Sequence, residues 1–136
     1  GALVLAALVG GVAWSDGLAS SEAHLAPYGQ LAELESIGKT YAGDGPALMT
    51  EYQPYGVRHF LRRLDPEGAS ELRRRLVPLA DGRVLGKGET APIDAFAPDT
   101  VRVYRSLVLL RATGGLPPTP FRLVRRGTYY DVWQRP

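Results

Sequence analysis

Five polar residues that could bind a ligand gather where a predicted strand gives way to a predicted helix. They are Glu51, Tyr52, Tyr55, Arg58 and His59, within the segment MTEYQPYGVRHFLRR. Carboxylate and hydroxyl groups at the carboxyl end of a strand could bind the hydroxyls of a sugar, and a helix starting at Gly56 would add free backbone N–H groups. The alternative is ordinary packing of the tyrosines, with Glu51 paired to a nearby arginine and His59 in solvent.

A second candidate surface is basic. Arg73, Arg74 and Arg75, together with Arg62 and Arg63, could face lipid headgroups or a phosphate-bearing donor. Each such charge contributes about 1 kcal/mol near an anionic surface. The competing explanation is a solvated helix face on which Glu67 and Glu71 are the ion-pair partners. The 16 Lys and Arg against 14 Asp and Glu give a net charge of only +2, so nucleic acid is not an expected partner.

The sequence lacks the residue patterns of several enzyme classes. It has no cysteine, which excludes disulfides, thiolate catalysis and cysteine-ligated zinc. The histidines His24 and His59 form no HxH or HExxH spacing, so no metal site is predicted. The segment GASE does not match the GxSxG nucleophile turn, and GKG at Lys87 does not match a phosphate-binding loop. No cofactor is expected, and the isolated chain is predicted to be non-catalytic.

Aromatic residues near the two ends of the chain allow two interpretations. Trp14, Trp133, Tyr129 and Tyr130 could form a platform on which a sugar stacks, or they could seal the edge of a hydrophobic core. Sealing is the commoner role in a terminal hairpin. Trp133 or Trp14 is therefore expected to be substantially buried.

Apolar spacing predicts the elements that would position these residues. A polar loop over residues 15–27 precedes a helix whose apolar positions are Leu31, Leu34, Ile37 and Tyr41, and which ends at Gly43. A short strand follows at 47–52. The next helix, over 55–64, has an apolar face formed by Val57, Phe60, Leu61 and Leu64. A turn and a short helical piece, capped by Asp65 or Ser70, are expected over 65–75.

The second half of the chain is predicted to be richer in strands. Asp81-Gly82 between apolar pairs indicates a hairpin turn, and residues 90–104 predict one short helical turn. A buried strand is expected at 105–112. A Gly/Pro loop then leads into a closing hairpin around Arg126-Gly127, with an inward face formed by Phe121, Leu123, Tyr130 and Val132.

These elements predict an α/β (α+β) fold for a chain of 136 residues. The expected architecture is a small two-layer sandwich with a mixed sheet, an N-terminal βαβ unit and a C-terminal β-hairpin. Residues 1–14 are either an apolar strand or the outer end of a transmembrane helix, since the run is shorter than the ~20 residues that a bilayer requires. Residues 15–136 are predicted to form a single soluble domain, excised from something larger.

The chain resembles the C-terminal part of large multi-pass membrane proteins from actinobacteria, which look like GT-C-type glycosyltransferases. The resemblance covers about residues 12–136. Its most specific segments are TEYQPYG, FLRRLDPEGASELRRR and the terminal hairpin from Phe121 to Arg135. TEYQPYG is also similar in placement to the Trp-Trp-Asp-Tyr-Gly motif of oligosaccharyltransferases. It lacks both tryptophans and has two extra residues, so acceptor binding is not transferred from that motif.

The resemblance implies a location on the extracytoplasmic side of the cell membrane. The domain would then be joined to the transmembrane portion of its own parent chain. It would shape the acceptor side of a membrane-embedded site that uses a polyprenyl-phosphate sugar, with a glycan or lipid-linked acceptor as a partner. The alternative is a cell-envelope interaction or assembly module without sugar binding, which could form a homodimer through an exposed sheet edge or an apolar patch.

Overall fold

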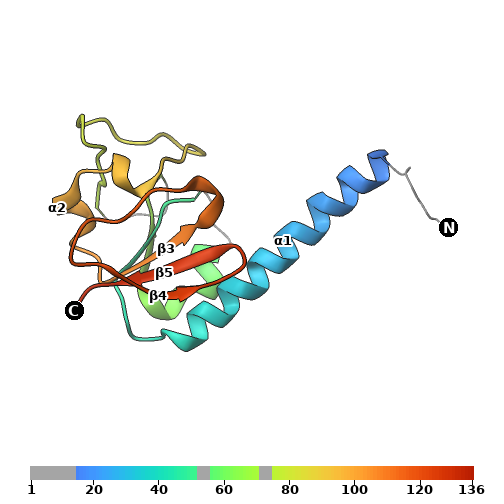
Figure 1. The fold of residues 1–136 in the computed structure, drawn as a ribbon, viewed down its shortest axis with the longest axis horizontal. Helices are drawn as coiled ribbons and strands as arrows, with labels where there is room; N and C mark the ends of the chain where they lie inside the picture. Colours follow the sequence, from blue (N-terminus) through green and yellow to red (C-terminus); the bar gives the residue numbers. More distant parts are fainter. Residues whose placement is uncertain (1–14, 52–55, 71–74) are drawn as a thin grey trace. The chain divides into compact units, whose positions relative to one another are not determined.

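The computed structural model describes residues 15–51, 56–70 and 75–136, with side chains from Tyr28 onward (Figure 1). The apolar run at residues 1–14 lies outside these ranges, so the first strand of the predicted βαβ unit stays a prediction. Among the described residues, none of the helices is both long and apolar enough to cross a bilayer. The chain divides into two compact units, and the boundary lies between Ala32 and Glu33.

Helix α1 spans Ser15–Thr40, so the loop predicted for residues 15–27 is wrong. That segment has no apolar stripe, but its alanine, leucine and glutamate residues have good intrinsic helix propensity. In the second unit, Leu34 and Ile37 of α1 are fully buried, as their spacing predicted. Gly43 has a φ of +90°. It follows the helix and donates its N–H to the carbonyl oxygen of Arg63 at 2.9 Å.

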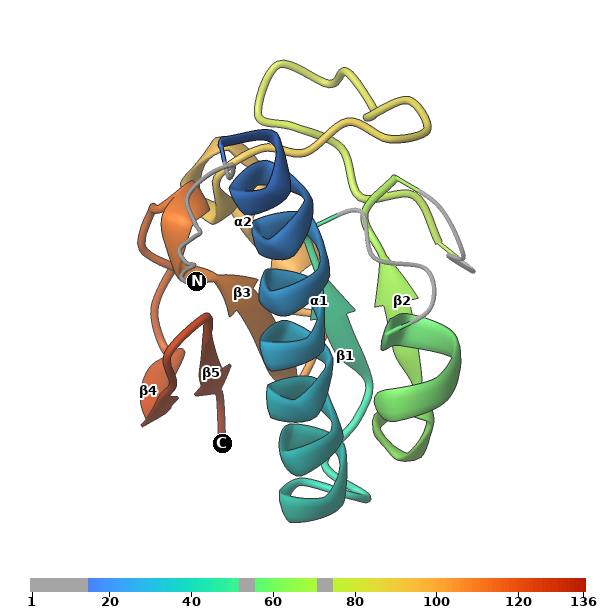
Figure 2. The ribbon, with the colours of Figure 1, turned by 90° about the vertical axis from the view of Figure 1, so that its right-hand side faces the viewer.

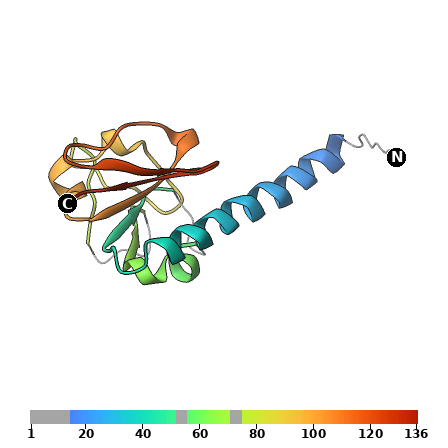
Figure 3. The same cartoon turned by 60° about the horizontal axis from the view of Figure 1, so that its bottom comes forward.

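Five strands form one mixed sheet in the order β2-β1-β3-β5-β4. The strands are β1 (Ala47–Met49), β2 (Pro66–Gly68), β3 (Ser106–Leu110), β4 (Arg122–Arg126) and β5 (Tyr130–Gln134). β1 pairs in parallel with β2 and β3, whereas β5 pairs antiparallel with β3 and β4. Figure 2 shows β1 between β2 and β3, and Figure 3 shows the red hairpin beside β3. The predicted mixed sheet and α+β class are confirmed, while the two-layer sandwich stays a prediction.

Two short helical turns connect β1 to β2. The first, η1 (Gly56–Phe60), is a π-helix, and the second, η2 (Arg62–Leu64), is a 3-10 helix. The continuous helix predicted over 55–64 is therefore wrong in type. Its apolar face is largely correct, because Val57, Leu61 and Leu64 are all buried. Figure 3 shows these turns (green) beside the C-terminal end of α1.

β2 occupies part of the segment for which a helical piece was predicted. Asp65 has a φ of 49° and ends η2, rather than capping a following helix. The Asp65 carbonyl oxygen accepts the N–H of Ala47 at 3.2 Å, and the Met49 carbonyl oxygen accepts the N–H of Ala69 at 3.1 Å. Pairing with β1 thus outweighs the local helical pattern, as tertiary context often does. The expected helical residues 71–74 lie outside the described ranges.

The segment between β2 and β3 has little regular structure. Asp81-Gly82 forms a turn in which the N–H of Leu79 bonds to the carbonyl oxygen of Arg83 at 2.7 Å. Within the described residues this turn joins no pair of strands, since Leu79 makes only an isolated bridge to Phe96. The hairpin predicted there is therefore wrong. Where one helical turn was expected, η3 (Ile93–Ala95) and α2 (Pro98–Val101) occur, and η4 (Arg111–Thr113) follows β3.

Alternation along the strands distributes the core over both faces of the sheet. On one face, Leu107 and Leu109 belong to a cluster with Leu48, Phe96 and Tyr104. On the other face, Val108 lies opposite Val132.

Of the four residues predicted to point inward from the hairpin, Phe121, Tyr130 and Val132 are buried. Leu123 is 39% exposed, so its placement was wrong. Trp133 is half-buried against the core cluster, and Trp14 lies outside the described residues.

Candidate functional site

Glu51 lies just beyond β1, at the carboxyl end of that strand. Its carboxylate accepts a hydrogen bond from the hydroxyl of Tyr130, a fully buried residue that begins β5. β3 separates β1 from β5 in the sheet, so this bond ties together two strands that are not neighbours. Within the described part of the chain, Tyr130 is the only partner of Glu51, which leaves one carboxylate oxygen able to accept a hydrogen bond from a ligand.

A second carboxylate holds the backbone on which Tyr130 lies. Glu33 of α1 accepts the N–H groups of Thr128 at 3.0 Å, Tyr129 at 3.1 Å and Tyr130 at 2.6 Å. The turn leaves no room for a side chain at Gly127, because a Cβ at that position would overlap the Glu33 carboxylate. Three amide donors on one carboxylate fix the hairpin turn. The hydroxyl of Tyr130 is thereby positioned by α1 as well as by the sheet.

Burial and neighbouring charges shift the pKa values of Glu51 and Tyr130. Burial raises the pKa of the Glu51 carboxyl, and the hydrogen bond from Tyr130 opposes that rise in part. The pKa of the Tyr130 hydroxyl is also raised, first by burial, then by its hydrogen bond to Glu51 and by the negative charges of Glu51 and Glu33. Tyr130 is therefore a neutral hydrogen-bond donor throughout the physiological pH range.

The structure distributes the predicted ligand-binding residues over more than one place. Glu51 is held by Tyr130, whereas the exposed His59 lines a separate pocket. Arg58 is exposed on η1, and Tyr52 and Tyr55 lie outside the described residues. Whether these five side chains bind one ligand together stays a prediction.

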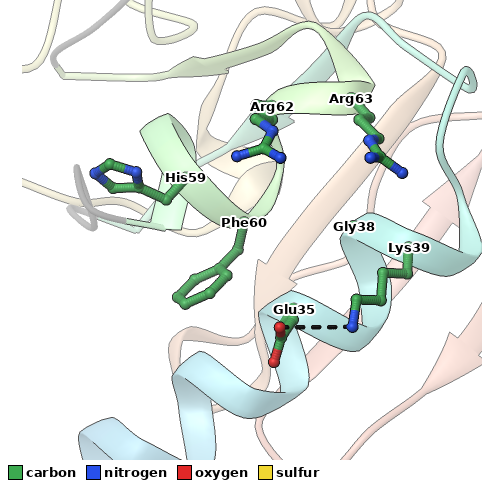
Figure 4. A pocket seen from close by; sticks show the side chains of 7 residues that line it. All are labelled: Glu35, Gly38, Lys39, His59, Phe60, Arg62 and Arg63. Atoms are coloured by element: carbon green, nitrogen blue, oxygen red, sulfur yellow. Dashed lines mark ion pairs between the residues drawn. The ribbon is translucent and has the colours of Figure 1, made fainter.

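The pocket that includes His59 lies between α1 and the two helical turns (Figure 4). Glu35, Gly38 and Lys39 line it from α1, and His59, Phe60, Arg62 and Arg63 line it from η1 and η2. Its volume is about 200 Å³, well above the ~10–15 Å³ that one ordered water needs. Three basic side chains, those of Lys39, Arg62 and Arg63, therefore share an open pocket with a single carboxylate, that of Glu35.

Gly38 allows the two sides of this pocket to approach each other. A Cβ at residue 38 would overlap the carbonyl oxygen of Phe60, so no larger residue fits without a backbone shift. Lys39 forms an ion pair with Glu35 across one helical turn, at 3.5 Å. The side chains of Arg62 and Arg63 have no hydrogen-bond or ion-pair partner among the described residues. Figure 4 shows both guanidinium groups on the η2 side of the pocket, facing α1.

Of the three arginines at 73–75, the structure describes only Arg75. The Arg75 guanidinium forms an ion pair with the fully buried Glu67 of β2 at 2.8 Å, and the Arg75 backbone N–H donates to the same carboxylate at 3.3 Å. The Tyr104 hydroxyl donates to the same carboxylate at 3.0 Å, and the Arg75 guanidinium lies 5.2 Å from the centre of the Tyr104 ring. Arg73 and Arg74 lie outside the described residues. Contact of this run with lipid headgroups stays a prediction.

Several residues of these sites were not singled out from the sequence. Glu33, Gly38, Lys39 and Tyr104 carried no motif, and their roles follow from which elements pack together. Glu67 was expected as an ion-pair partner of the arginine run, and it forms that pair with Arg75. Among the described residues, no group of three or more His, Asp or Glu lies close enough together to hold a metal ion.

No protein-family model, no curated protein and no solved structure gave a significant match to the chain.

Proposed function

We propose that this chain is a non-catalytic, extracytoplasmic domain of a glycosyltransferase-like membrane protein, and that it shapes the acceptor side of a membrane-embedded site. The observation that carries the proposal is the Glu51 carboxylate at the carboxyl end of β1. One of its oxygens is fixed by the Tyr130 hydroxyl, and the other has no partner among the described residues. A carboxylate held in this way can accept a hydrogen bond from an acceptor hydroxyl. The resemblance of residues 12–136 to the C-terminal part of GT-C-type membrane proteins supports the membrane-protein part of the proposal.

The reading frame upstream of Gly1 tests the membrane parent. Several apolar segments of about 20 residues are expected there, with an acidic residue in the first extracytoplasmic loop. A start codon or a signal peptide close to Gly1 would refute the proposal that the chain belongs to a multi-pass membrane protein.

Transfer kinetics of the full-length protein test the role of Glu51. Glu51→Gln should lower kcat/KM for the acceptor by about 10–100-fold, because a charge-assisted hydrogen bond contributes ~1.5–3 kcal/mol. The apparent affinity for the sugar donor should stay unchanged. Glu89→Gln is the matched control, since Glu89 is an exposed loop carboxylate that bonds to the N–H of Gly86. An unchanged acceptor kcat/KM in a folded Glu51→Gln protein would refute the assignment.

One observation favours an interaction module as the second candidate. β4 lies at the edge of the sheet, where Leu123 is 39% and Val124 45% exposed. An open edge strand with apolar side chains can pair with a strand of another chain. A bulge between Leu123 and Arg125 interrupts this edge, and bulges discourage such pairing. Sedimentation over a concentration series distinguishes the cases, because a dimer that Val124→Lys abolishes supports the module and a monomer at all concentrations excludes self-pairing.

A further inference from the structure

We propose that Lys39, Arg62 and Arg63 form a binding site for a phosphate or diphosphate group. The site is the pocket of about 200 Å³ between α1 and the η1–η2 turns. It does not include Glu51, and it holds whether or not the chain belongs to a glycosyltransferase-like protein.

The unpartnered arginines are the first reason. Arg62 and Arg63 are adjacent on a 3-10 turn of only three residues, and neither side chain has a partner among the described residues. Several other arginines of this domain are engaged, such as Arg75 with Glu67, Arg102 with Asp99, and Arg135 with the carbonyl oxygen of Tyr104. Guanidinium groups match the geometry of phosphate oxygens and bind them through paired N–H donors.

The second reason is the way the cations are brought together. Lys39 comes from the last turn of α1, and Arg62, Arg63 and His59 come from elements that follow β1. The close approach of Gly38 to the Phe60 carbonyl holds these elements at contact distance. Figure 4 shows the Lys39 ammonium and the two guanidinium groups on opposite walls of the same pocket. Donors that converge from two elements can surround a tetrahedral anion, which cations spread along one exposed helix cannot do.

The charge of the pocket selects the chemical class of the ligand. The basic side chains of Lys39, Arg62 and Arg63 share the pocket with one carboxylate, Glu35, which pairs with Lys39 at 3.5 Å. A phosphate group carries up to two negative charges and several acceptor oxygens, so it can engage both arginines and compete with Glu35 for Lys39. A single carboxylate ligand would leave part of the positive charge unmatched.

Titration calorimetry of the 136-residue chain with inorganic pyrophosphate tests the site. Arg63→Gln should weaken binding about tenfold, and the double variant Arg62→Gln/Arg63→Gln should weaken it further. Glu35→Gln should strengthen binding, because it removes the competing carboxylate. Arg122→Gln is the matched control: Arg122 is exposed on β4, lacks a side-chain partner among the described residues, and does not line the pocket. The affinity of Arg122→Gln for pyrophosphate should stay within twofold of that of the unchanged chain.

Two results would overturn the proposal. The first is the absence of saturable pyrophosphate binding. The second is an equal loss of affinity in Arg63→Gln and Arg122→Gln, which would show a general charge effect. In either case Lys39, Arg62 and Arg63 would only balance the negative end of the α1 dipole.

Vesicles separate the two sources of a phosphate group. The chain is mixed with vesicles of phosphatidylglycerol, and with phosphatidylcholine vesicles as the neutral control. Binding to the anionic vesicles that pyrophosphate and Arg62→Gln/Arg63→Gln both abolish identifies a lipid headgroup as the source. Binding of pyrophosphate without vesicle binding identifies a soluble phosphate compound. Vesicle binding that neither pyrophosphate nor the double variant reduces would contradict the site.

Discussion

The domain contains two glutamate–tyrosine pairs that differ in what surrounds the carboxylate. Glu67 is fully buried, receives the Tyr104 hydroxyl, and lies 2.8 Å from the Arg75 guanidinium. Glu51 is only half-buried, receives the Tyr130 hydroxyl, and forms no ion pair within the described part of the chain. A buried carboxylate with a cation and a hydroxyl donor is satisfied by the protein itself. A carboxylate with a hydroxyl donor alone can still respond to pH and to a ligand.

Removing the buried carboxylate should have the largest effect on stability. Glu67→Ala leaves the Tyr104 hydroxyl without this acceptor and the Arg75 guanidinium without its counter-charge, and Arg75 can regain only part of its hydration because its side chain is 37% exposed. The expected loss in the free energy of unfolding is about 3 kcal/mol, measured by urea denaturation. If Glu67→Ala lowered the free energy of unfolding by less than Tyr130→Phe does, the fully buried pair would not be the more stabilising of the two.

Removing each tyrosine hydroxyl should have a smaller, unequal effect. Tyr104→Phe is expected to lower the free energy of unfolding by about 2 kcal/mol, because it takes a donor from a fully buried carboxylate. Tyr130→Phe should cost about 1 kcal/mol, since water can reach part of Glu51. The second variant should also raise the pKa of Glu51 further, which the carbon-13 shift of its carboxyl group reports. A lower pKa would show that the Tyr130 bond does not favour the charged form.

The smallest effect should come from Glu51 itself, and it should depend on pH. Burial raises the pKa of Glu51 above its ordinary value of 4.5, so the folded chain holds a proton that the unfolded chain releases. This contribution to stability is present below pH 4.5 and is lost as the pH rises through the raised pKa. Glu51→Gln, which cannot ionise, should remove that part of the pH dependence of unfolding. An identical pH profile in the two proteins would show that Glu51 titrates alike in both states.

The sequence predicted which apolar residues are buried more accurately than it predicted which side chains contact one another. The spacing of Val57, Leu61 and Leu64 indicated the correct buried face. It did not reveal a π turn followed by a 3-10 turn, because that geometry depends on how η1 packs against Gly38 of another element.

The partners of the candidate site depend on contacts that no local pattern encodes. Glu51 meets Tyr130 across 79 residues of sequence, and Glu67 meets Tyr104 across 37. Both contacts follow from the strand order β2-β1-β3-β5-β4, in which sequence neighbours such as β3 and β4 are not spatial neighbours. Glu51 could be identified as a candidate from its place after a predicted strand. The tyrosine that holds it could be identified only once the sheet was known.

The short strand β1, which lies between β2 and β3, has a consequence for the order in which the domain folds. β4 and β5 are joined by a three-residue turn, 127–129, and can pair as soon as that turn closes. β1 acquires both neighbours only when distant parts of the chain arrive, since Ala47 pairs with Pro66 and with Ser106. Closing such long loops is slow, because the chain entropy is lost before the contacts form. Pulse-labelled hydrogen exchange should therefore find the amides of the hairpin protected before those of Ala47–Met49.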